Sequence, residues 1–285
     1  MFDSICVCGA GTMGSGIAQT IAQSGFKTLL FDVNEEVLAK AKSNIYKSLY
    51  GLVAKNKITE EQHTQITNSL IFINNIEQVK ADLIIEAIIE KLDAKISLFK
   101  KLAQINSLQT VFASNTSSLS ITEVQSAIEH PERVIGLHFF NPATVMKLVE
   151  VVKGGYSDEQ TIHDADVFCK EINKVPVICQ DAPGFIVNRV ARHYYLESLK
   201  LLENKIASKE TIDNILEASG FRLGPFKLMD LIGMDINLAV TEHLYETSNR
   251  AERFKPSPIQ QQLVAEGKLG KKKGEGFYKY NEQSN

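Results

Sequence analysis

The feature that most constrains the fold is a glycine-rich segment near the amino terminus, Gly9-Ala-Gly-Thr-Met-Gly14. It follows directly after an apolar, β-rich run, Ser4–Cys8, and directly precedes a helical pattern, Ser15–Gln23. In this context the first glycine permits a tight turn, the second lets a pyrophosphate approach the backbone, and the third lets helix and strand pack closely. Unpaired N–H groups at the start of the helix then form an anion site. We therefore expect a strand–loop–helix unit that binds a dinucleotide.

The next β-rich run, Lys27–Phe31, is followed by Asp32, 18 residues after Gly14. An acid at this place accepts hydrogen bonds from the adenosine ribose hydroxyls. Val33 and Asn34 come next rather than an arginine, so a 2′-phosphate would be repelled. The pattern predicts NAD rather than NADP; the competing interpretation is a plain glycine turn and a capping aspartate. The predicted contacts here are Gly9, Gly11, Thr12, Met13, Gly14 and Asp32.

β-rich runs alternate with amphipathic helical patterns over the first two-thirds of the chain. This alternation predicts an α/β domain, a Rossmann-like doubly wound sheet that is mostly parallel and covered by helices on both faces. Capping boxes mark three expected helix starts, at 59–62, 120–123 and 157–160. The further expected strands and helices are strands 70–73, 82–87, 110–113, 134–139 and 175–179, and helices 35–53 and 92–105.

The pattern changes at the turn cluster Asp181-Ala-Pro-Gly184, after which it is helical nearly to the end. We predict a domain boundary near residue 183, with a dinucleotide-binding domain at 1–183 and an all-α domain at 184–285. A helical domain attached to such a sheet has two obvious uses, closing a substrate cleft and dimerising. The expected helices of this part are 186–202, 209–218, 229–247 and 258–266.

Composition and charge exclude several other classes of protein. Lys and Arg number 31 against 34 Asp and Glu, so no basic excess is available for a nucleic-acid backbone. No apolar stretch approaches the ~18 residues of a membrane span, and the first residues do not resemble a signal peptide. The four cysteines match neither a disulfide framework nor a zinc site. A soluble, cytoplasmic protein without a metal is the expectation.

Polar side chains interrupt the second half of the predicted sheet. Asn115, Ser117 and Ser118 follow one run, His138 lies inside the next, and Glu150 ends the run 146–150. Ligands of doubly wound sheets bind outside the carboxyl ends of strands, so these groups could converge on one crevice. A histidine paired with a carboxylate is a general base whose tautomer its partner fixes.

Each of these residues also has a plainer interpretation. A histidine between Leu137 and Phe139 is often a satisfied core residue, and Glu150 could be an exposed strand residue. A Ser-His-Glu hydrolase is conceivable, but the sequence contains no G-x-S-x-G elbow. Zinc is disfavoured because no third ligand has a recognisable spacing. The remaining histidines are expected at the surface: His63, His130, His163, His193 and His243. Asn188, in the first turn of the first helix after Pro183-Gly184, either points toward the domain cleft or bonds locally.

Taken together, these segments resemble the 3-hydroxyacyl-CoA dehydrogenase family, in its stand-alone 3-hydroxybutyryl-CoA form. The similarity covers essentially the whole chain, and the combination is far more specific than any one motif. The segments that carry it are 7–14, Ala113-Ser-Asn-Thr-Ser-Ser118, Leu137-His-Phe-Phe-Asn-Pro142, Asp181-Ala-Pro-Gly-Phe-Ile-Val-Asn-Arg189 and Gly276-Phe-Tyr278.

The resemblance implies roles for individual residues. His138 is the implied catalytic base and Glu150 its partner, while Ser117 and Asn188 contact the reacting oxygen and thioester. Asn115, Glu90 and Lys95 resemble cofactor contacts of the family. Ser48 and either Lys55 or Lys57 resemble its CoA-contacting region, and the spacing does not choose between the two lysines. One departure is Lys91, where the family usually shows Asn.

The implied reaction is NAD-dependent oxidation of an L-3-hydroxyacyl-CoA, or the reverse reduction, in fatty-acid or related acyl-CoA metabolism. The family's helical domain dimerises, so a homodimer is expected. The segment Gly224–Gly233 is similar to members that act in aromatic-acid degradation. Two alternatives stay open: a dehydrogenase of a free hydroxy or sugar acid, and a non-catalytic NADH-binding protein. The sequence sets neither the acyl chain length nor the physiological direction.

Overall fold

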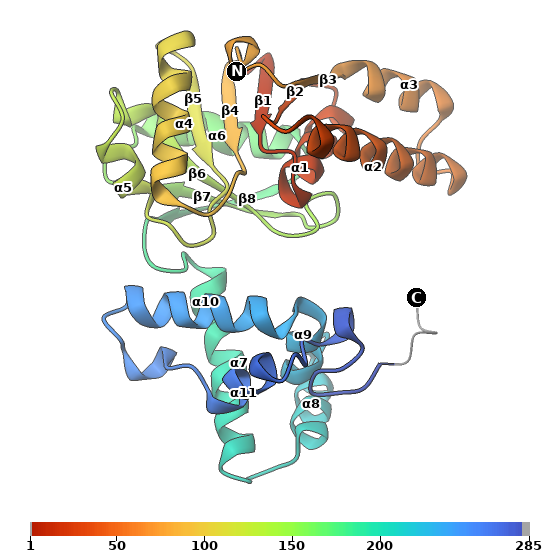
Figure 1. The fold of residues 1–285 in the computed structure, drawn as a ribbon, viewed down its shortest axis with the longest axis vertical. Helices are drawn as coiled ribbons and strands as arrows, with labels where there is room; N and C mark the ends of the chain where they lie inside the picture. Colours follow the sequence, from red (N-terminus) through yellow and green to blue (C-terminus); the bar gives the residue numbers. More distant parts are fainter. Residues whose placement is uncertain (1, 281–285) are drawn as a thin grey trace. The chain divides into compact units, whose positions relative to one another are not determined.

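The computed structural model describes residues 2–280, and its contacts divide the chain into two compact units (Figure 1). The first, Met1–Ala182, is an α/β unit, and the second, Pro183–Asn285, is helical. The predicted fold class, a Rossmann-like sheet followed by an all-α part, is confirmed.

One sheet forms the centre of the first unit, with strand order β3-β2-β1-β4-β5-β6-β7-β8. All neighbouring strands run parallel except β6 and β7, which pair antiparallel. The glycine-rich loop therefore leaves the middle of the sheet, where parallel strands need crossover helices. The strands are β1 Ser4–Cys8, β2 Lys27–Phe31, β3 Leu70–Ile73, β4 Leu83–Glu86, β5 Val111–Ser114, β6 Val134–Phe139, β7 Leu148–Lys153 and β8 Val175–Gln180.

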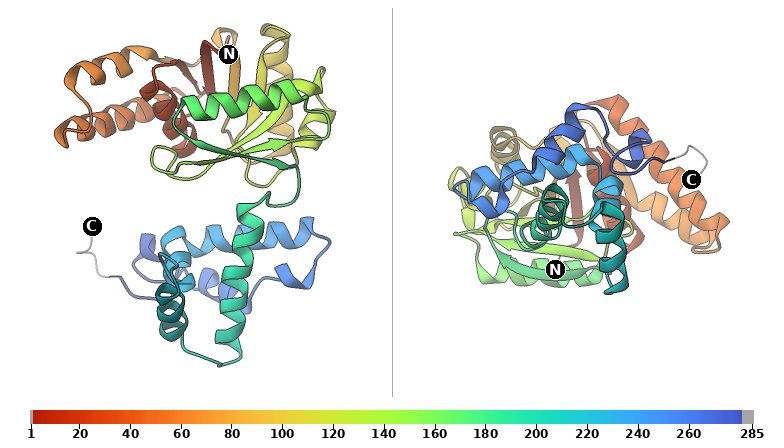
Figure 2. Two further views of the ribbon diagram at one scale, coloured as in Figure 1. Left: turned by 180° about the vertical axis from the view of Figure 1, so that it is seen from behind. Right: turned by 90° about the horizontal axis from the view of Figure 1, so that it is seen from below.

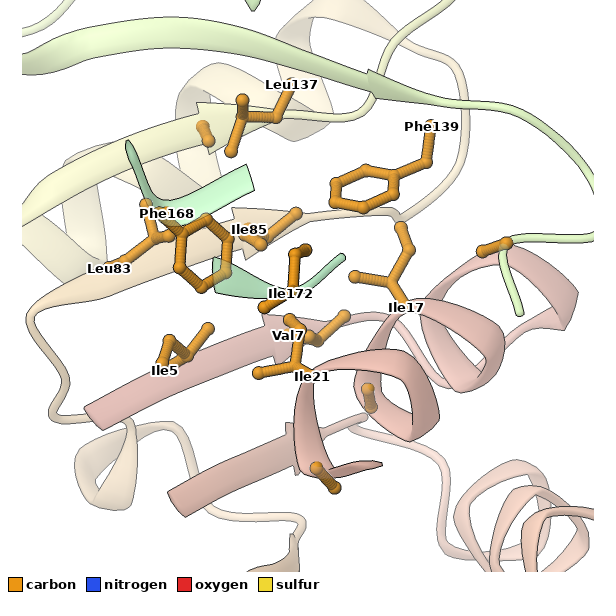
Figure 3. Packing of buried hydrophobic residues seen from close by; sticks show 14 of the residues in the cluster. Ile5, Val7, Ile17, Ile21, Leu83, Ile85, Leu137, Phe139, Phe168 and Ile172 are labelled. Atoms are coloured by element: carbon orange, nitrogen blue, oxygen red, sulfur yellow. The ribbon is translucent and has the colours of Figure 1, made fainter. Parts of the chain in front are cut away.

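Helices cover both faces of this sheet, as the two views of Figures 1 and 2 show. Alternate strand residues point to opposite faces and pack into two separate apolar clusters. In the cluster of Figure 3, Ile17 and Ile21 of α1 lie against Val7 and Ile85 of the strands. The helices of this unit are α1 Thr12–Gln23, α2 Glu35–Ala54, α3 Glu60–Ser69, α4 Leu92–Ile105, α5 Ile121–Ser126 and α6 Glu159–Glu171.

The strand register brings the polar segments together at the carboxyl ends of the parallel strands, which is the edge of the sheet meant below. The last residue of β1, Cys8, is level with Phe31 of β2 and with Glu86 of β4. Glu86 is in turn level with Ser114 of β5. The segments that follow β1, β2, β4 and β5 therefore all leave the sheet at the same edge.

The second unit packs its helices around an apolar cluster that includes Leu199, Phe226 and Met229. Two buried aspartates fasten its carboxyl-terminal segment: Asp213 accepts the Tyr278 hydroxyl, and Asp230 accepts the backbone N–H groups of Phe277 and Tyr278. The helices are α7 Val187–Glu203, α8 Lys209–Ala218, α9 Pro225–Ile232, α10 Met234–Thr247 and α11 Pro258–Ala265.

Three local predictions are wrong. The helix expected at 229–247 is interrupted at Gly233, whose φ of +102° is incompatible with a continuous helix. The capping box expected at Ser157 is replaced by Asp158, which caps α6, while the buried Ser157 hydroxyl binds inside the unit. His63, expected at the surface, is buried against the ring of Tyr50.

Candidate active site

The glycine-rich loop connects β1 to α1 and is close-packed at two of its three glycines. A side chain at Gly9 would meet the carbonyl of Ala87 at 2.5 Å, and one at Gly14 would meet the carbonyl of Gly9 at 1.8 Å. At Gly11 nothing lies within 4 Å, so the space beside the first turn of α1 is open. Glycine at 9 and 14 is thus required by the protein itself, whereas glycine at 11 leaves room for a ligand.

The first turn of α1 faces this open space. The intrahelical bonds begin with Ser15, whose N–H donates to the Gly11 carbonyl at 2.9 Å. The N–H groups that precede it, on Thr12, Met13 and Gly14, lack an intrahelical acceptor and form the positive end of the helix dipole. Thr12 is exposed, while the Met13 side chain packs on the core and anchors the turn. This arrangement suits a pyrophosphate.

Asp32 stands beside the loop, directly after β2. One carboxylate oxygen accepts the N–H of Ala10 at 2.8 Å, and the other accepts the N–H of Asn34 at 2.9 Å. The carboxylate also lines an apolar pocket of about 560 Å³, whose walls include Val33, Ile89 and Leu98. The apolar walls of this pocket suit a flat base, and the Asp32 carboxylate suits ribose hydroxyls. The residues present therefore fit the adenosine half of a dinucleotide without a 2′-phosphate.

His138 and Glu150 form a buried pair on the neighbouring strands β6 and β7. They occupy directly opposite positions in the antiparallel register. The distance from His138 Nδ1 to Glu150 Oε2 is 2.7 Å, with side-chain exposures of 7% and 1%. A carboxylate at this distance accepts a hydrogen bond from Nδ1–H, which leaves Nε2 as the basic ring nitrogen. The sequence run 146–150 ends at Glu150, but the strand does not. β7 extends to Lys153, so Glu150 lies within it.

The segment after β5 is held by Glu90. One oxygen of this carboxylate accepts the Ser117 N–H at 3.3 Å and the Ser118 hydroxyl at 2.7 Å, and it also accepts the Thr116 hydroxyl. Burial raises the pKa of Glu90, but the charge of Lys95 and the hydrogen bonds lower it further, to below its usual range. The Glu90 carboxylate therefore organises the segment that contains Ser117.

Lys95 lies beneath this segment with only 1% of its side chain exposed. Its ammonium is 2.6 Å from Glu86 Oε1 and 3.1 Å from Glu90 Oε2. The side chain thus neutralises carboxylates within the protein instead of presenting its charge at the surface. Asn115, also predicted as a cofactor contact, accepts the N–H of Phe139 at 2.9 Å and so ties the ends of β5 and β6 together.

A second pocket, of about 410 Å³, lies beside the glycine loop between α1, α2 and the segment after β6. Its walls carry polar residues that sequence reasoning missed: Gln19, Lys40, Asn44, Asn141 and Thr144. They lie on helix surfaces or in a loop, where no motif distinguishes them from solvated residues. Only Asn141 belonged to a noted segment.

The residues predicted to contact CoA lie farther along α2. Ser48 is exposed and accepts the amide of Gln19 at 3.1 Å, which joins it to the wall of the second pocket. Lys55 follows the last residue of α2, and both Lys55 and Lys57 are exposed. The structure leaves the choice between the two lysines open.

Asn188 belongs to the other unit, where it is the second residue of α7 and half-buried. Its predicted role beside Ser117 stays a prediction. Within residues 183–280, a larger pocket of about 1020 Å³ is lined mainly by charged residues of α7, α10 and the segment 252–255, and it includes none of the predicted site residues. Across residues 2–280, no cluster of His, Cys, Asp or Glu is arranged to hold a metal ion, and no helix could span a membrane.

Comparison with known proteins places both units in one family. The family model described as "3-hydroxyacyl-CoA dehydrogenase, NAD binding domain" matches residues 4–182. The model of the C-terminal domain of 3-hydroxyacyl-CoA dehydrogenase matches residues 184–280. The first match ends at residue 182, which is also the last residue of the first compact unit.

Individual relatives are similar over nearly the whole chain. The 3-hydroxyadipyl-CoA dehydrogenase of Escherichia coli K12 is 45% identical over 96% of this chain, which spans only 58% of that protein. The mitochondrial hydroxyacyl-coenzyme A dehydrogenase of Sus scrofa is 42% identical, covering 97% of this chain and 90% of the relative. A crystal structure titled 3-hydroxybutyryl-CoA dehydrogenase, from E. coli K12, has a TM-score of 0.97 at 43% identity, covering all of this chain and 61% of the other.

Proposed function

The chain belongs to the 3-hydroxyacyl-CoA dehydrogenase family, and we propose that it oxidises an L-3-hydroxyacyl-CoA to the 3-oxoacyl-CoA, or runs the reverse reduction. The observation that carries this proposal is the buried His138–Glu150 pair, 2.7 Å apart, at the sheet edge where the dinucleotide loop also lies. A base of this kind is what an alcohol needs when it loses a proton and a hydride together.

NAD is the cofactor, and in this site it would supply the acceptor for the hydride that leaves C3 of the substrate. The residues proposed to hold it are those of the glycine loop, with its N–H groups toward the pyrophosphate, and Asp32 toward the adenosine ribose. The predicted contacts at Asn115, Glu90 and Lys95 belong to the same edge of the sheet. Of these, the exposed end of Glu90 (41%) is better placed for a direct contact than Lys95 (1%).

His138 performs the proton transfer in this proposal. Nδ1 donates to Glu150, so Nε2 accepts the proton of the 3-hydroxyl in the oxidation direction. The Glu150 carboxylate then stabilises the imidazolium that results, within a buried environment where a charge pair is strong. In the reduction direction the same imidazolium returns its proton to the carbonyl oxygen. A positioned base of this kind contributes ~10²–10⁴ to the rate.

Four side chains that the family resemblance names are proposed to contact the substrate. Ser117, fixed by Glu90, and Asn188, on α7, would contact the reacting oxygen and the thioester. Ser48 and Lys55, or Lys57 in its place, would contact the CoA portion along α2. In this proposal the first unit binds NAD, and the helical unit forms a homodimer with that of a second copy.

We also propose a cytoplasmic location, which the state of the cysteines supports. All four are unpaired thiols in the structure, three of them buried. Burial raises the pKa of Cys169 to about 12, so this thiol stays protonated at neutral pH.

The name of the E. coli relative suggests one specific substrate, 3-hydroxyadipyl-CoA. The similarity of Gly224–Gly233 to members of aromatic-acid degradation points the same way. The test panel should therefore contain 3-hydroxyadipyl-CoA beside 3-hydroxybutyryl-CoA and longer 3-hydroxyacyl-CoAs.

The experiment measures NAD reduction at 340 nm with the L and D forms of 3-hydroxybutyryl-CoA, and with this panel. The proposal predicts NADH formation with the L thioesters and none with the D form. Turnover of gulonate-type acids but no thioester would favour a sugar-acid dehydrogenase. NADH binding without turnover of any substrate would favour a non-catalytic binding protein.

A further inference from the structure

One buried carboxylate lies at the edge of the sheet where the glycine loop begins, and it has no part in the proposed chemistry. Glu86 is the last residue of β4, and none of it is exposed. It lies between Cys8 of β1 and Ser114 of β5 in the strand register. A carboxylate in such a place persists only when hydrogen bonds and an opposite charge satisfy it.

Three groups satisfy the Glu86 carboxylate. Oε1 accepts the ammonium of Lys95 at 2.6 Å and the N–H of Ile88 at 2.7 Å. Oε2 accepts the Ser114 hydroxyl at 2.6 Å. Lys95 also pairs with Glu90, and the Ser114 hydroxyl also accepts the N–H of Thr116. Both residues therefore connect Glu86 to the segment Asn115–Ser118.

The connection through Ser114 is short. The Ser114 hydroxyl that donates to Glu86 also accepts the N–H of Thr116, at 3.3 Å. The Thr116 hydroxyl in turn accepts the N–H of Ser118 at 3.2 Å and that of Leu119 at 2.9 Å. This connection fixes the start of the segment.

The connection through Lys95 is electrostatic. Its ammonium lies between Glu86 and Glu90, and Glu90 accepts the Ser117 N–H. Two carboxylates therefore share one buried ammonium. If the charge of Glu86 were removed, the ammonium would be drawn to Glu90 alone, and Glu90 would be pulled away from the hydrogen-bond donors of the segment.

We propose that Glu86 is a positioning residue that fixes Ser117 in the substrate site through Lys95 and Ser114. The inference rests on the proposed function, which assigns Ser117 to the reacting thioester. Glu86 itself touches neither cofactor nor substrate in this assignment, and its effect reaches the reaction through the segment Asn115–Ser118.

The variant that isolates this role is Glu86→Gln. Glutamine keeps the size and can still accept the Ile88 N–H and bond to Ser114, so mainly the charge that faces Lys95 is lost. The matched control is Asp82→Asn. Asp82 precedes β4 at the opposite edge of the sheet, where it accepts the N–H groups of Asp3 and Ser4. Each variant removes one carboxylate charge, at opposite ends of the same strand.

The first measurement is amide hydrogen exchange of the peptide that covers 115–119. In Glu86→Gln we expect exchange of these amides to rise roughly tenfold or more, and in Asp82→Asn to stay at the wild-type rate. Unchanged exchange in Glu86→Gln, or an equal rise throughout the sheet, would overturn the proposal. If Glu86→Gln does not fold, Ser114→Ala removes the shorter connection and is expected to raise the same exchange.

The second measurement is a double-mutant cycle with Ser117→Ala. We expect Glu86→Gln to lower kcat/KM for the acyl-CoA roughly 10- to 100-fold, the effect of a substrate-positioning group displaced by about an ångström. In the Ser117→Ala background the same change should cost less than about threefold. Equal losses in both backgrounds would show that Glu86 acts independently of Ser117 and would overturn the proposal. The exchange experiment needs no substrate, so it tests the inference even if the wild type turned over no thioester and the proposed function failed.

Discussion

His138 and Glu150 are direct partners across the antiparallel strands β6 and β7, with Nδ1 2.7 Å from Oε2. Antiparallel pairing gives each residue one opposite neighbour, so the backbone register itself sets the spacing of the pair. The sheet register thus places the two side chains beside each other, and the Phe140 ring that follows β6 packs against the imidazole.

The first prediction concerns this pair. His138→Gln is expected to lower kcat by about 10²–10⁴, because the proton acceptor is lost. Glu150→Gln should also lower kcat strongly, since the imidazolium loses its stabilising charge. NADH affinity, measured by fluorescence titration, should change little in either variant. Loss of both turnover and NADH binding in His138→Gln would mean that this histidine is structural.

The second prediction separates the two uses of glycine in the loop. Gly14→Ala places a Cβ at 1.8 Å from the Gly9 carbonyl, so we expect a loss of stability of about 1–3 kcal/mol or more. In Gly11→Ala the added Cβ has no protein atom within 4 Å. The melting temperature of this variant should therefore equal that of the wild type. Its NADH affinity should fall nonetheless, because the methyl group occupies the space for the pyrophosphate. Wild-type NADH affinity in Gly11→Ala would contradict this position of the cofactor.

The third prediction concerns the choice of cofactor. Asp32→Asn keeps an acceptor for the N–H of Ala10 but loses the charge that faces the ribose. We expect NADH to bind roughly 10- to 100-fold more weakly, the range for hydrogen bonds to a charged group, and the preference over NADPH to shrink. Glu36→Gln, an equal change of charge in the first turn of α2, is the control and should leave both affinities unchanged. An unaltered preference in Asp32→Asn would contradict the assignment.

Features of the fold and the site that depend on neighbouring residues can be predicted from the sequence. Contacts between residues far apart in the chain cannot. The glycine loop and seven of the eight strands are local patterns, and the sequence predicts them within a few residues; β7, Leu148–Lys153, is not among the predicted strands. The end of α9 was missed because Gly233 lies inside an otherwise continuous helical pattern. The partners of Glu86 were also invisible, because Lys95 and Ser114 come together only when β4 and β5 pair and α4 folds back. Long-range hydrogen bonds of this kind leave no spacing to read.

The fourth prediction is a pH dependence that arises from Glu90. Its pKa is below the usual range, because Lys95 and the hydrogen bonds outweigh the effect of burial. A carboxyl with a lowered folded-state pKa contributes stability above its unfolded pKa of about 4.3, and this contribution is lost as the pH falls through the folded value. Wild type should therefore melt higher than Glu90→Gln at neutral pH, and the difference should shrink toward zero in acid. A difference that persists in acid would show that the charge of Glu90 is not the cause.

The fifth prediction tests the fastening of the carboxyl-terminal segment in the helical unit. Asp230 is fully buried and accepts the N–H groups of Phe277 and Tyr278. Asp230→Asn leaves at least one of them without its acceptor, so we expect a loss of about 2–3 kcal/mol in urea unfolding. The control is Asp235→Asn, whose carboxylate is 40% exposed and pairs with Lys272, and it should cost less than about 1 kcal/mol. Equal effects of the two changes would contradict the account.

Two substrates that differ only in the CoA group show whether this chain acts on a thioester. The measurement is the rate of NADH oxidation with acetoacetyl-CoA and with free acetoacetate, at equal concentrations of the wild-type enzyme. The account predicts rapid oxidation with acetoacetyl-CoA and a kcat/KM for acetoacetate lower by orders of magnitude. Comparable rates with both substrates, or no oxidation with the thioester although NADH binds, would contradict it.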